Sequence, residues 1–474
     1  MKTLRLLLPF LLAASSAVSF AQTALSEPSS DRSRVLVLTD IANEPDDEES
    51  LVRYLVYSNE FETEGLIATT STWLKKGPRE DLIRRQLAAY AQVRPNLLKH
   101  AAGYPTAEEL GAMTHTGQTE YGMAAVGADK KTAGSQHIIS VLDQPDPRPV
   151  WVTVWGGANT LAQALTDLRA TRSEAEVKAA VAKMRVYAIS DQDDAGLWLR
   201  NEFPDLFYVV SPSRQDGNEY WRATWTGISG DHWYKNGPKH KFHLVQNPWL
   251  EENVIKNHGP LGALYPKVAY IMEGDTPCFI GLVRNGLSWD VSPAYGGWGG
   301  RYVLYQAHGE SRKIWTNNAS SRDTVTADNG VTETSDPATI WRWREHFQHD
   351  FAARMDWCVA DVYEKANHNP LPVLNGDKTK NVITLQAKGG TELTFSAEGT
   401  SDPDKNNVKL AWWIYSDLLP RRYEPTLTNA EGPTTALKLP TLTRPGAVHV
   451  ILQVEDDGTP RLFAYRRAIV EVTP

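Results

Sequence analysis

Short apolar runs alternate with amphipathic stretches along most of the chain. Continuous apolar runs predict buried strands at residues 35–38, 65–69, 149–154 and 184–189. Between them, apolar residues recur at helical spacing within 51–56, 82–90 and 160–168. Because alternating strands and helices build βαβ units, the pattern predicts an α/β domain whose mostly parallel central sheet is flanked by helices.

The pattern changes near Asn369, where a segment rich in turn-forming residues begins. Beyond this segment, short apolar stretches separated by turn signals predict strands at 383–386, 393–397, 410–415, 448–454 and 468–472. Strands of this length and spacing are typical of an all-β, immunoglobulin-like sandwich. We therefore predict an α/β domain over residues 34–369 and a β-sandwich domain over residues 370–474.

The start of the chain has the layout of a secretory signal peptide. A positively charged beginning and an apolar run at 6–14 precede the small residues Ser19 and Ala21, which occupy the cleavage-site positions. A membrane anchor is the alternative, but the apolar run is short for crossing a bilayer. We predict a signal peptide over residues 1–21, a polar linker over 22–33, and a secreted or periplasmic protein with no later membrane segment.

Charge and cysteine content narrow the function classes. The chain of 474 residues has a formal charge of −8 and no basic tract, which argues against nucleic-acid binding. Its two cysteines, Cys278 and Cys358, are too few for a disulfide framework. These two cysteines could form one disulfide or stay as two buried thiols, and the sequence leaves both alternatives open. The sequence is also compatible with a homo-oligomer.

An acidic cluster follows the first predicted strand. Asp40 lies at the end of that strand, and Glu44, Asp46, Asp47 and two further glutamates lie where the next helix should begin. Ligands of parallel sheets bind at the carboxyl ends of strands, and crowded carboxylates suit a hard cation, either Ca²⁺ or Mg²⁺. The alternative is that acidic residues in a first helical turn only complement the helix dipole, which leaves Asp40 unexplained.

Four segments resemble nucleoside hydrolases in order and approximate spacing. Residues 35–55 resemble the family's opening strand with its paired aspartates, and residues 150–164 its glycine turn. Residues 270–283 are similar to its late aspartate motif, and residues 198–209 distantly resemble its Glu-Phe-Asn segment.

A closer resemblance covers nearly all of the chain after the signal peptide. The sequence is similar to a secreted bacterial family, labelled cellulose-binding proteins, in which a nucleoside-hydrolase-like domain precedes a β-sandwich. The motifs that carry this resemblance are Glu44-Pro45-Asp46-Asp47, Tyr121-Gly122-Met123, Gly274-Asp275-Thr276-Pro277 and Gly296-Gly297-Trp298-Gly299-Gly300-Arg301-Tyr302.

The resemblance implies a role for each matching residue. One Ca²⁺ would hold a water and the hydroxyls of a sugar, with Asp40 as a metal ligand and the base that accepts the proton of the water. Asp47, Asp275 and the carbonyl of Trp155 would be the other metal ligands. Asp46 and Asp275 would hold sugar hydroxyls.

Further sugar contacts are expected from Asn201 or Glu202, by a looser match, and from Trp298. Trp73 is another candidate for a sugar subsite. For Trp298, a purely structural turn of its glycine-rich segment is the alternative.

Departures from nucleoside hydrolases shape the expected function. Leu38 replaces the first aspartate of that family, and Gly274 stands where many members carry a histidine that assists the leaving base. We therefore expect a Ca²⁺-dependent glycoside hydrolase that cleaves a sugar, with a furanosidic bond as one option. A non-catalytic carbohydrate- or cellulose-binding protein and an extracellular nucleoside hydrolase are the alternatives.

Overall fold

The computed structural model describes residues 32–42, 44–211 and 219–474, and the predicted signal peptide lies outside these residues. The first part is an α/β domain around one eight-stranded sheet of order β3-β2-β1-β4-β5-β6-β8-β7. All neighbours pair in parallel except β7 and β8. The strands are β1 Ser33–Thr39, β2 Phe61–Ala68, β3 Thr114–Thr116, β4 Val150–Val154, β5 Met184–Ala188, β6 Phe207–Val210, β7 Val303–Tyr305 and β8 Ile314–Thr316.

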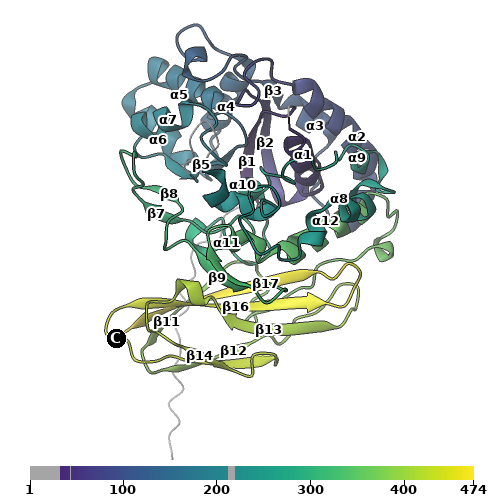
Figure 1. Cartoon of the computed structure of the whole chain (residues 1–474), viewed down its shortest axis with the longest axis vertical. Helices are drawn as coiled ribbons and strands as arrows, with labels where there is room; N and C mark the ends of the chain where they lie inside the picture. Colours follow the sequence, from purple (N-terminus) through teal and green to yellow (C-terminus); the bar gives the residue numbers. More distant parts are fainter. Residues whose placement is uncertain (1–31, 43, 212–218) are drawn as a thin grey trace, which may run out of the picture.

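Helices cover both faces of this sheet (Figure 1). Their bounds are α1 Asp46–Val56, α2 Glu80–His100, α3 Ala107–Ala112, α4 Ala133–Asp143, α5 Asn159–Thr171, α6 Glu174–Lys183, α7 Ala195–Glu202, α8 Asn247–Leu250, α9 Gly259–Gly262, α10 Pro277–Ile280, α11 Ala338–Trp341 and α12 Arg344–Trp357. A short antiparallel hairpin, β9 Asp323–Thr326 and β10 Thr332–Ser335, lies outside the sheet.

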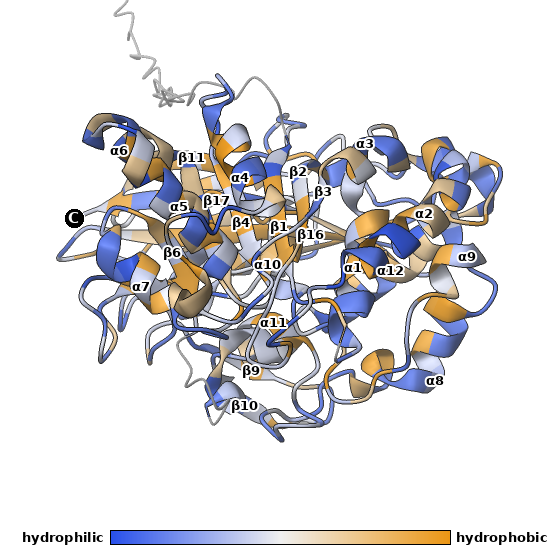
Figure 2. Ribbon diagram, turned by 90° about the horizontal axis from the view of Figure 1, so that it is seen from above, coloured by the Kyte–Doolittle hydropathy of each residue, from blue (hydrophilic) through white to orange (hydrophobic). Residues whose placement is uncertain are grey.

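Side chains of the central strands point alternately to two separate cores. Val35 and Val37 of β1 join the core beneath α1, α2 and α12, whereas Leu36 and Leu38 join the core beneath α4 and α5. Burial on both faces explains why these strands read as continuous apolar runs. Figure 2 shows hydrophobic segments along the central strands, whereas the outer helices carry both hydrophilic and hydrophobic segments.

The C-terminal part is a sandwich of two small sheets. One has the order β11-β17-β16-β13 and the other β12-β15-β14, and only β11 and β17 pair in parallel. The strands are β11 Ile383–Lys388, β12 Glu392–Ser396, β13 Val408–Ile414, β14 Thr426–Thr428, β15 Thr434–Lys438, β16 Gly446–Asp456 and β17 Phe463–Thr473. The predicted boundary at 369/370 falls between α12 and β11.

The β-sandwich packs its four-stranded sheet against the α/β domain (Figure 1). Ile451, Phe463 and Tyr465 belong to the same buried core as α12. The ring of Phe463 stacks on His346 with centroids 3.8 Å apart, and the backbone N–H of Tyr465 donates to the carbonyl of Asn285 at 2.9 Å. The two domains therefore share one apolar core.

Two points from the sequence are resolved by the fold. Cys278 and Cys358 are separate buried thiols. Within the described residues, every helix is too short or too polar to cross a membrane.

Candidate metal and sugar site

The site lies where the strand order of the main sheet reverses. Strands β2 and β3 extend from one side of β1, and β4, β5 and β6 extend from the other. Asp40 directly follows β1, and Trp155 directly follows the adjacent strand β4. The backbone N–H of Trp155 donates to the Leu38 carbonyl (2.8 Å), which continues the pairing of the two strands. Ligands of open α/β sheets bind at such a switch point, outside the carboxyl ends of the strands.

Three carboxylates from two distant segments converge beside these strand ends. Asp46 and Asp47 lie in the first turn of α1, and Asp275 lies two residues before α10. One oxygen of each lies within 4.8 Å of the others. Because Ca²⁺–oxygen distances of about 2.3–2.6 Å place two ligand oxygens at most about 5 Å apart, this trio has dimensions that fit one calcium ion.

Buried oxygens without a hydrogen-bond partner support the same fit. Within the described residues, Oδ1 of Asp40 and Oδ2 of Asp275 are both buried and accept no hydrogen bond. An unpaired buried carboxylate oxygen is costly unless a donor or a cation satisfies it. Both atoms therefore lack a donor or cation that the described residues could supply.

The pKa values of these groups have moved in the direction that crowding predicts. Burial raises the pKa of Asp40 to about 6, although a hydrogen bond from Ser71 opposes the rise. Burial and the charge of Asp40 raise the pKa of Asp46 to about 7. Burial and neighbouring carboxylates hold the pKa values of Asp47 and Asp275 well above the usual range. Ionising all four groups therefore requires a compensating positive charge.

The predicted ligands are only partly brought together. Asp40 lies outside the tight trio, whereas Asp46, expected to bind sugar, lies within it. The carbonyl of Trp155 accepts a hydrogen bond from Nε2 of Gln192 (2.7 Å), which leaves its second lone pair for a cation. A Cβ on Gly156 would lie 2.3 Å from Oδ1 of Asp40, so glycine is needed for this close approach.

A buried ion pair joins the two segments that carry the trio. Arg53 of α1 pairs with Glu273, both side chains are fully buried, and Nη2 of Arg53 donates to Oε1 of Glu273 at 3.0 Å. The backbone N–H of Glu273 donates to Glu49 of α1 (2.8 Å), and the hydroxyl of Tyr265 donates to Glu273 (2.8 Å). This network fixes Asp275 relative to Asp46 and Asp47.

Three residues predicted to contact sugar lie elsewhere, which corrects the sequence interpretation. Asn201 and Glu202 are exposed at the end of α7, where Asn201 accepts a hydrogen bond from Ser311 (2.7 Å) and Glu202 pairs with Arg169 (2.6 Å). They lie on the outer side because α7 begins only at Ala195 and leads away from the strand end.

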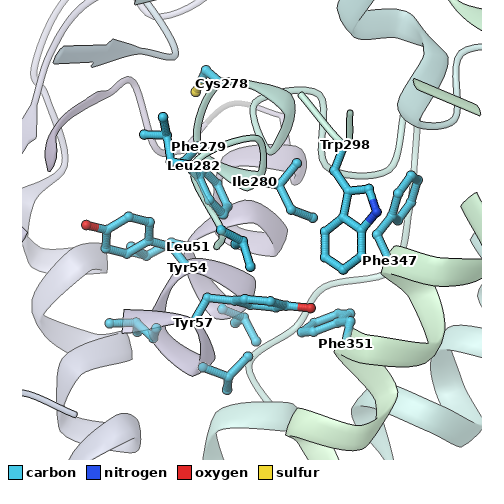
Figure 3. Close-up of a cluster of buried hydrophobic side chains, with 14 of the residues drawn as sticks. Leu51, Tyr54, Tyr57, Cys278, Phe279, Ile280, Leu282, Trp298, Phe347 and Phe351 are labelled. Atoms are coloured by element: carbon cyan, nitrogen blue, oxygen red, sulfur yellow. The ribbon is translucent and has the colours of Figure 1, made fainter. Parts of the chain in front are cut away.

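Trp298 is the third correction, since only 1% of it is exposed. Its ring packs edge-on against Phe347 of α12 within the shared core (Figure 3). The glycine-rich segment turns inward here: Gly300 has φ +90°, and a Cβ on Gly296 would lie 2.3 Å from the hydroxyl of Tyr415. The structural alternative for this segment is therefore the correct one.

The cleft above the carboxylates contains residues that the sequence interpretation missed. Its cavity of about 410 Å³ is lined by Gln192, Tyr220, Trp225, Trp233, Tyr234 and Tyr270, together with the predicted Trp73 and the acidic residues. Oε1 of Gln192 and Nε1 of Trp225 are buried and have no hydrogen-bond partner within the described residues. The density of aromatic residues between 220 and 234 was the only available signal, because this segment has no regular periodicity.

Comparison with known proteins gives two family matches. The family described as "Cellulose-binding Sde182, nucleoside hydrolase-like domain" matches residues 34–302. The family described as "Cellulose-binding protein Sde0182, C-terminal domain" matches residues 392–472. No match was found among curated proteins.

Solved structures include one similar over its full length. It is a nucleoside hydrolase-related hypothetical protein from Saccharophagus degradans that is associated with carbohydrate metabolism, with 36% identity and a TM-score of 0.79 over 93% of this chain and 100% of that chain. The type III effector protein XopQ, complexed with adenosine diphosphate ribose, matches at 12% identity and a TM-score of 0.32 over 70% of this chain and 94% of that chain.

Proposed function

Because the chain belongs to the Sde182 family of cellulose-binding proteins with a nucleoside hydrolase-like domain, we propose that it is a secreted, Ca²⁺-dependent glycoside hydrolase. The observation that carries this proposal is the set of four crowded carboxylates at the switch point of the sheet, two of which have buried oxygens without a partner. A carbohydrate is the substrate class that the family description favours.

Calcium would be held by Asp47, Asp275, the Trp155 carbonyl and one oxygen of Asp46 or Asp40. When bound, it would lower the pKa of a coordinated water and orient that water toward the sugar. Asp40 is the base in this proposal because its buried Oδ1 is available to accept the proton. The negative charge of the carboxylates would stabilise a positively charged, oxocarbenium-like sugar.

The remaining polar groups of the cleft would position the sugar. Oε1 of Gln192 would accept a hydrogen bond from a hydroxyl, and Nε1–H of Trp225 would donate one to a sugar oxygen. Asp46 would accept from a hydroxyl, as its place in the cleft allows. The contacts of Gln192 and Trp225 would each satisfy a buried atom that otherwise carries a desolvation cost.

Nucleoside hydrolysis is disfavoured by the backbone at Gly274. A Cβ there would lie 2.6 Å from Oδ2 of Asp46, so a histidine at this position, as in nucleoside hydrolases, would require the Asp46 carboxylate to shift. No histidine is among the described residues that line the cleft. The second candidate function is non-catalytic carbohydrate binding, which the aromatic lining favours.

The test is a screen of the purified protein on plant and bacterial glycans, with calcium and with a chelator, alongside Asp40→Asn. The proposal expects release of sugar that needs calcium and is lost in the variant. Binding without cleavage by the wild type would leave the non-catalytic function. Cleavage that survives both the chelator and Asp40→Asn would refute the proposed mechanism.

A further inference from the structure

Three large aromatic side chains stand exposed around the mouth of the cleft. Trp73, Trp233 and Tyr270, which we call the aromatic rim, are 46%, 51% and 46% exposed and all line the cavity that contains the carboxylates. Trp73 follows β2, Trp233 precedes α8, and Tyr270 lies between α9 and α10. Separate parts of the chain therefore place aromatic surface at one opening.

The rim differs from the aromatic floor of the same cleft. The floor residues Tyr220 and Trp225 are 5% and 4% exposed, and their rings pack edge-on with centroids 5.2 Å apart. The rim residues Trp233 and Tyr270 also pack edge-on, at 5.1 Å, yet about half of each remains open to solvent. Exposed aromatic surface of this kind is costly in water and marks a binding surface.

Trp221 provides a contrast outside the cleft. It is 47% exposed, but it does not line the cavity, and the guanidinium of Arg222 lies over its ring at 4.4 Å. Its exposed ring is thus already covered on one face by a cation. Among the described residues, no cation lies over the ring of Trp73, Trp233 or Tyr270.

The charge of the cleft restricts what the rim could bind. Five carboxylates line the cavity (Asp40, Glu44, Asp46, Asp47 and Asp275), and among its described lining residues none is basic. One calcium ion offsets only two negative charges. An acidic chain would therefore be repelled, whereas a neutral chain of sugar rings would offer apolar ring faces to the rim and hydroxyls to the carboxylates.

We infer that the aromatic rim binds the sugar units next to the one held at the carboxylates, so that the ligand is a neutral oligosaccharide or polysaccharide chain. This inference rests on the proposed sugar-binding function of the cleft. It adds that the ligand extends over more than one sugar unit, because the carboxylates and the rim line the same cavity.

The experiment compares wild type, Trp73→Ala, Trp233→Ala and Tyr270→Ala with the control Trp221→Ala, all with millimolar calcium. Affinity electrophoresis uses hydroxyethylcellulose, xylan, arabinan and polygalacturonate, and calorimetry uses the oligosaccharide series of whichever neutral polymer retards the protein. We expect retardation by at least one neutral polymer and none by polygalacturonate. Each rim variant should weaken binding of the longer oligosaccharides about three- to tenfold and leave binding of the monosaccharide unchanged.

Two results would overturn the inference. One is an affinity that does not rise with chain length; the other is a loss in Trp221→Ala equal to that in the rim variants. Either result can occur while calcium-dependent cleavage of a short glycoside persists, so the proposed hydrolysis would stand. Conversely, rim-dependent binding of a chain that is never cleaved would support the inference and refute the hydrolysis.

Discussion

Replacing Asp40, the proposed base, by its amide should stabilise the metal-free protein while lowering the proposed turnover. The pKa of Asp40 rises from 3.8 to about 6 because the group is buried. In the folded state this carboxyl therefore holds its proton more tightly than in the unfolded chain, and stability falls as pH rises from about 4 to about 6. Above both pKa values, the buried ionised carboxylate lowers the free energy of unfolding by about 3 kcal/mol. Asp40→Asn removes this penalty.

We expect metal-free Asp40→Asn to be more stable than metal-free wild type by up to about 3 kcal/mol at pH 8, and the difference to shrink toward pH 5. Calcium should stabilise wild type much more than the variant, because the variant loses a negative ligand. Turnover should fall by about 10²–10⁴ from loss of the base alone.

The assay is urea unfolding at pH 8 and pH 5, with chelator and with calcium, beside turnover on the glycan that the screen identifies. Asp205→Asn is the matched control, because the Asp205 carboxylate is 70% exposed. This substitution should change neither the free energy of unfolding nor the turnover. A metal-free Asp40→Asn protein that is less stable than wild type at pH 8 would show that burial does not penalise this carboxylate. Turnover close to wild type would show that Asp40 is not the base.

Three further variants test separate parts of the site. Asp46→Asn should weaken sugar binding more than turnover at saturation, which a comparison of KM with kcat would detect, and a pure loss of kcat would contradict the assignment. Gly156→Ala places a Cβ 2.3 Å from Oδ1 of Asp40 and should lower calcium affinity at least about tenfold, as measured by calorimetry. The control is Gly111→Ala, because a Cβ there has no neighbour closer than 3.7 Å. Arg53→Met leaves Glu273 buried without its partner and should cost about 3–5 kcal/mol in urea unfolding, whereas a cost below about 1 kcal/mol would contradict the role of this ion pair.

Local patterns predicted the elements of the site that lie on regular structure. Asp40, Asp46 and Asp47 follow a strand of continuous apolar residues and open an amphipathic helix, so their neighbours in sequence are also their neighbours in space. The resemblance to a known family supplied Asp275, which is more than two hundred residues away and comes close only through tertiary packing.

The errors arose where position depends on packing that no local pattern records. Asn201 and Glu202 were assigned by a distant motif, but the phase and direction of α7 turn them to solvent. Trp298 was expected to contact sugar, whereas it is buried in the core that the two domains share. Trp233 and Tyr270 lie in irregular segments, so only the three-dimensional arrangement reveals that they face the cleft.

The apolar core shared by the two domains makes them a single cooperative unit. Phe463 and Tyr465 of β17 cover His346 and Trp343 at the start of α12, and the same helix contributes Phe347 and Phe351 beneath α1, which carries Asp46 and Asp47. Removing the sandwich would therefore expose the helix that packs beneath the candidate metal site. We expect the C-terminal domain to act as part of the scaffold of this site, and the α/β domain would not be expected to keep the site intact as an isolated fragment.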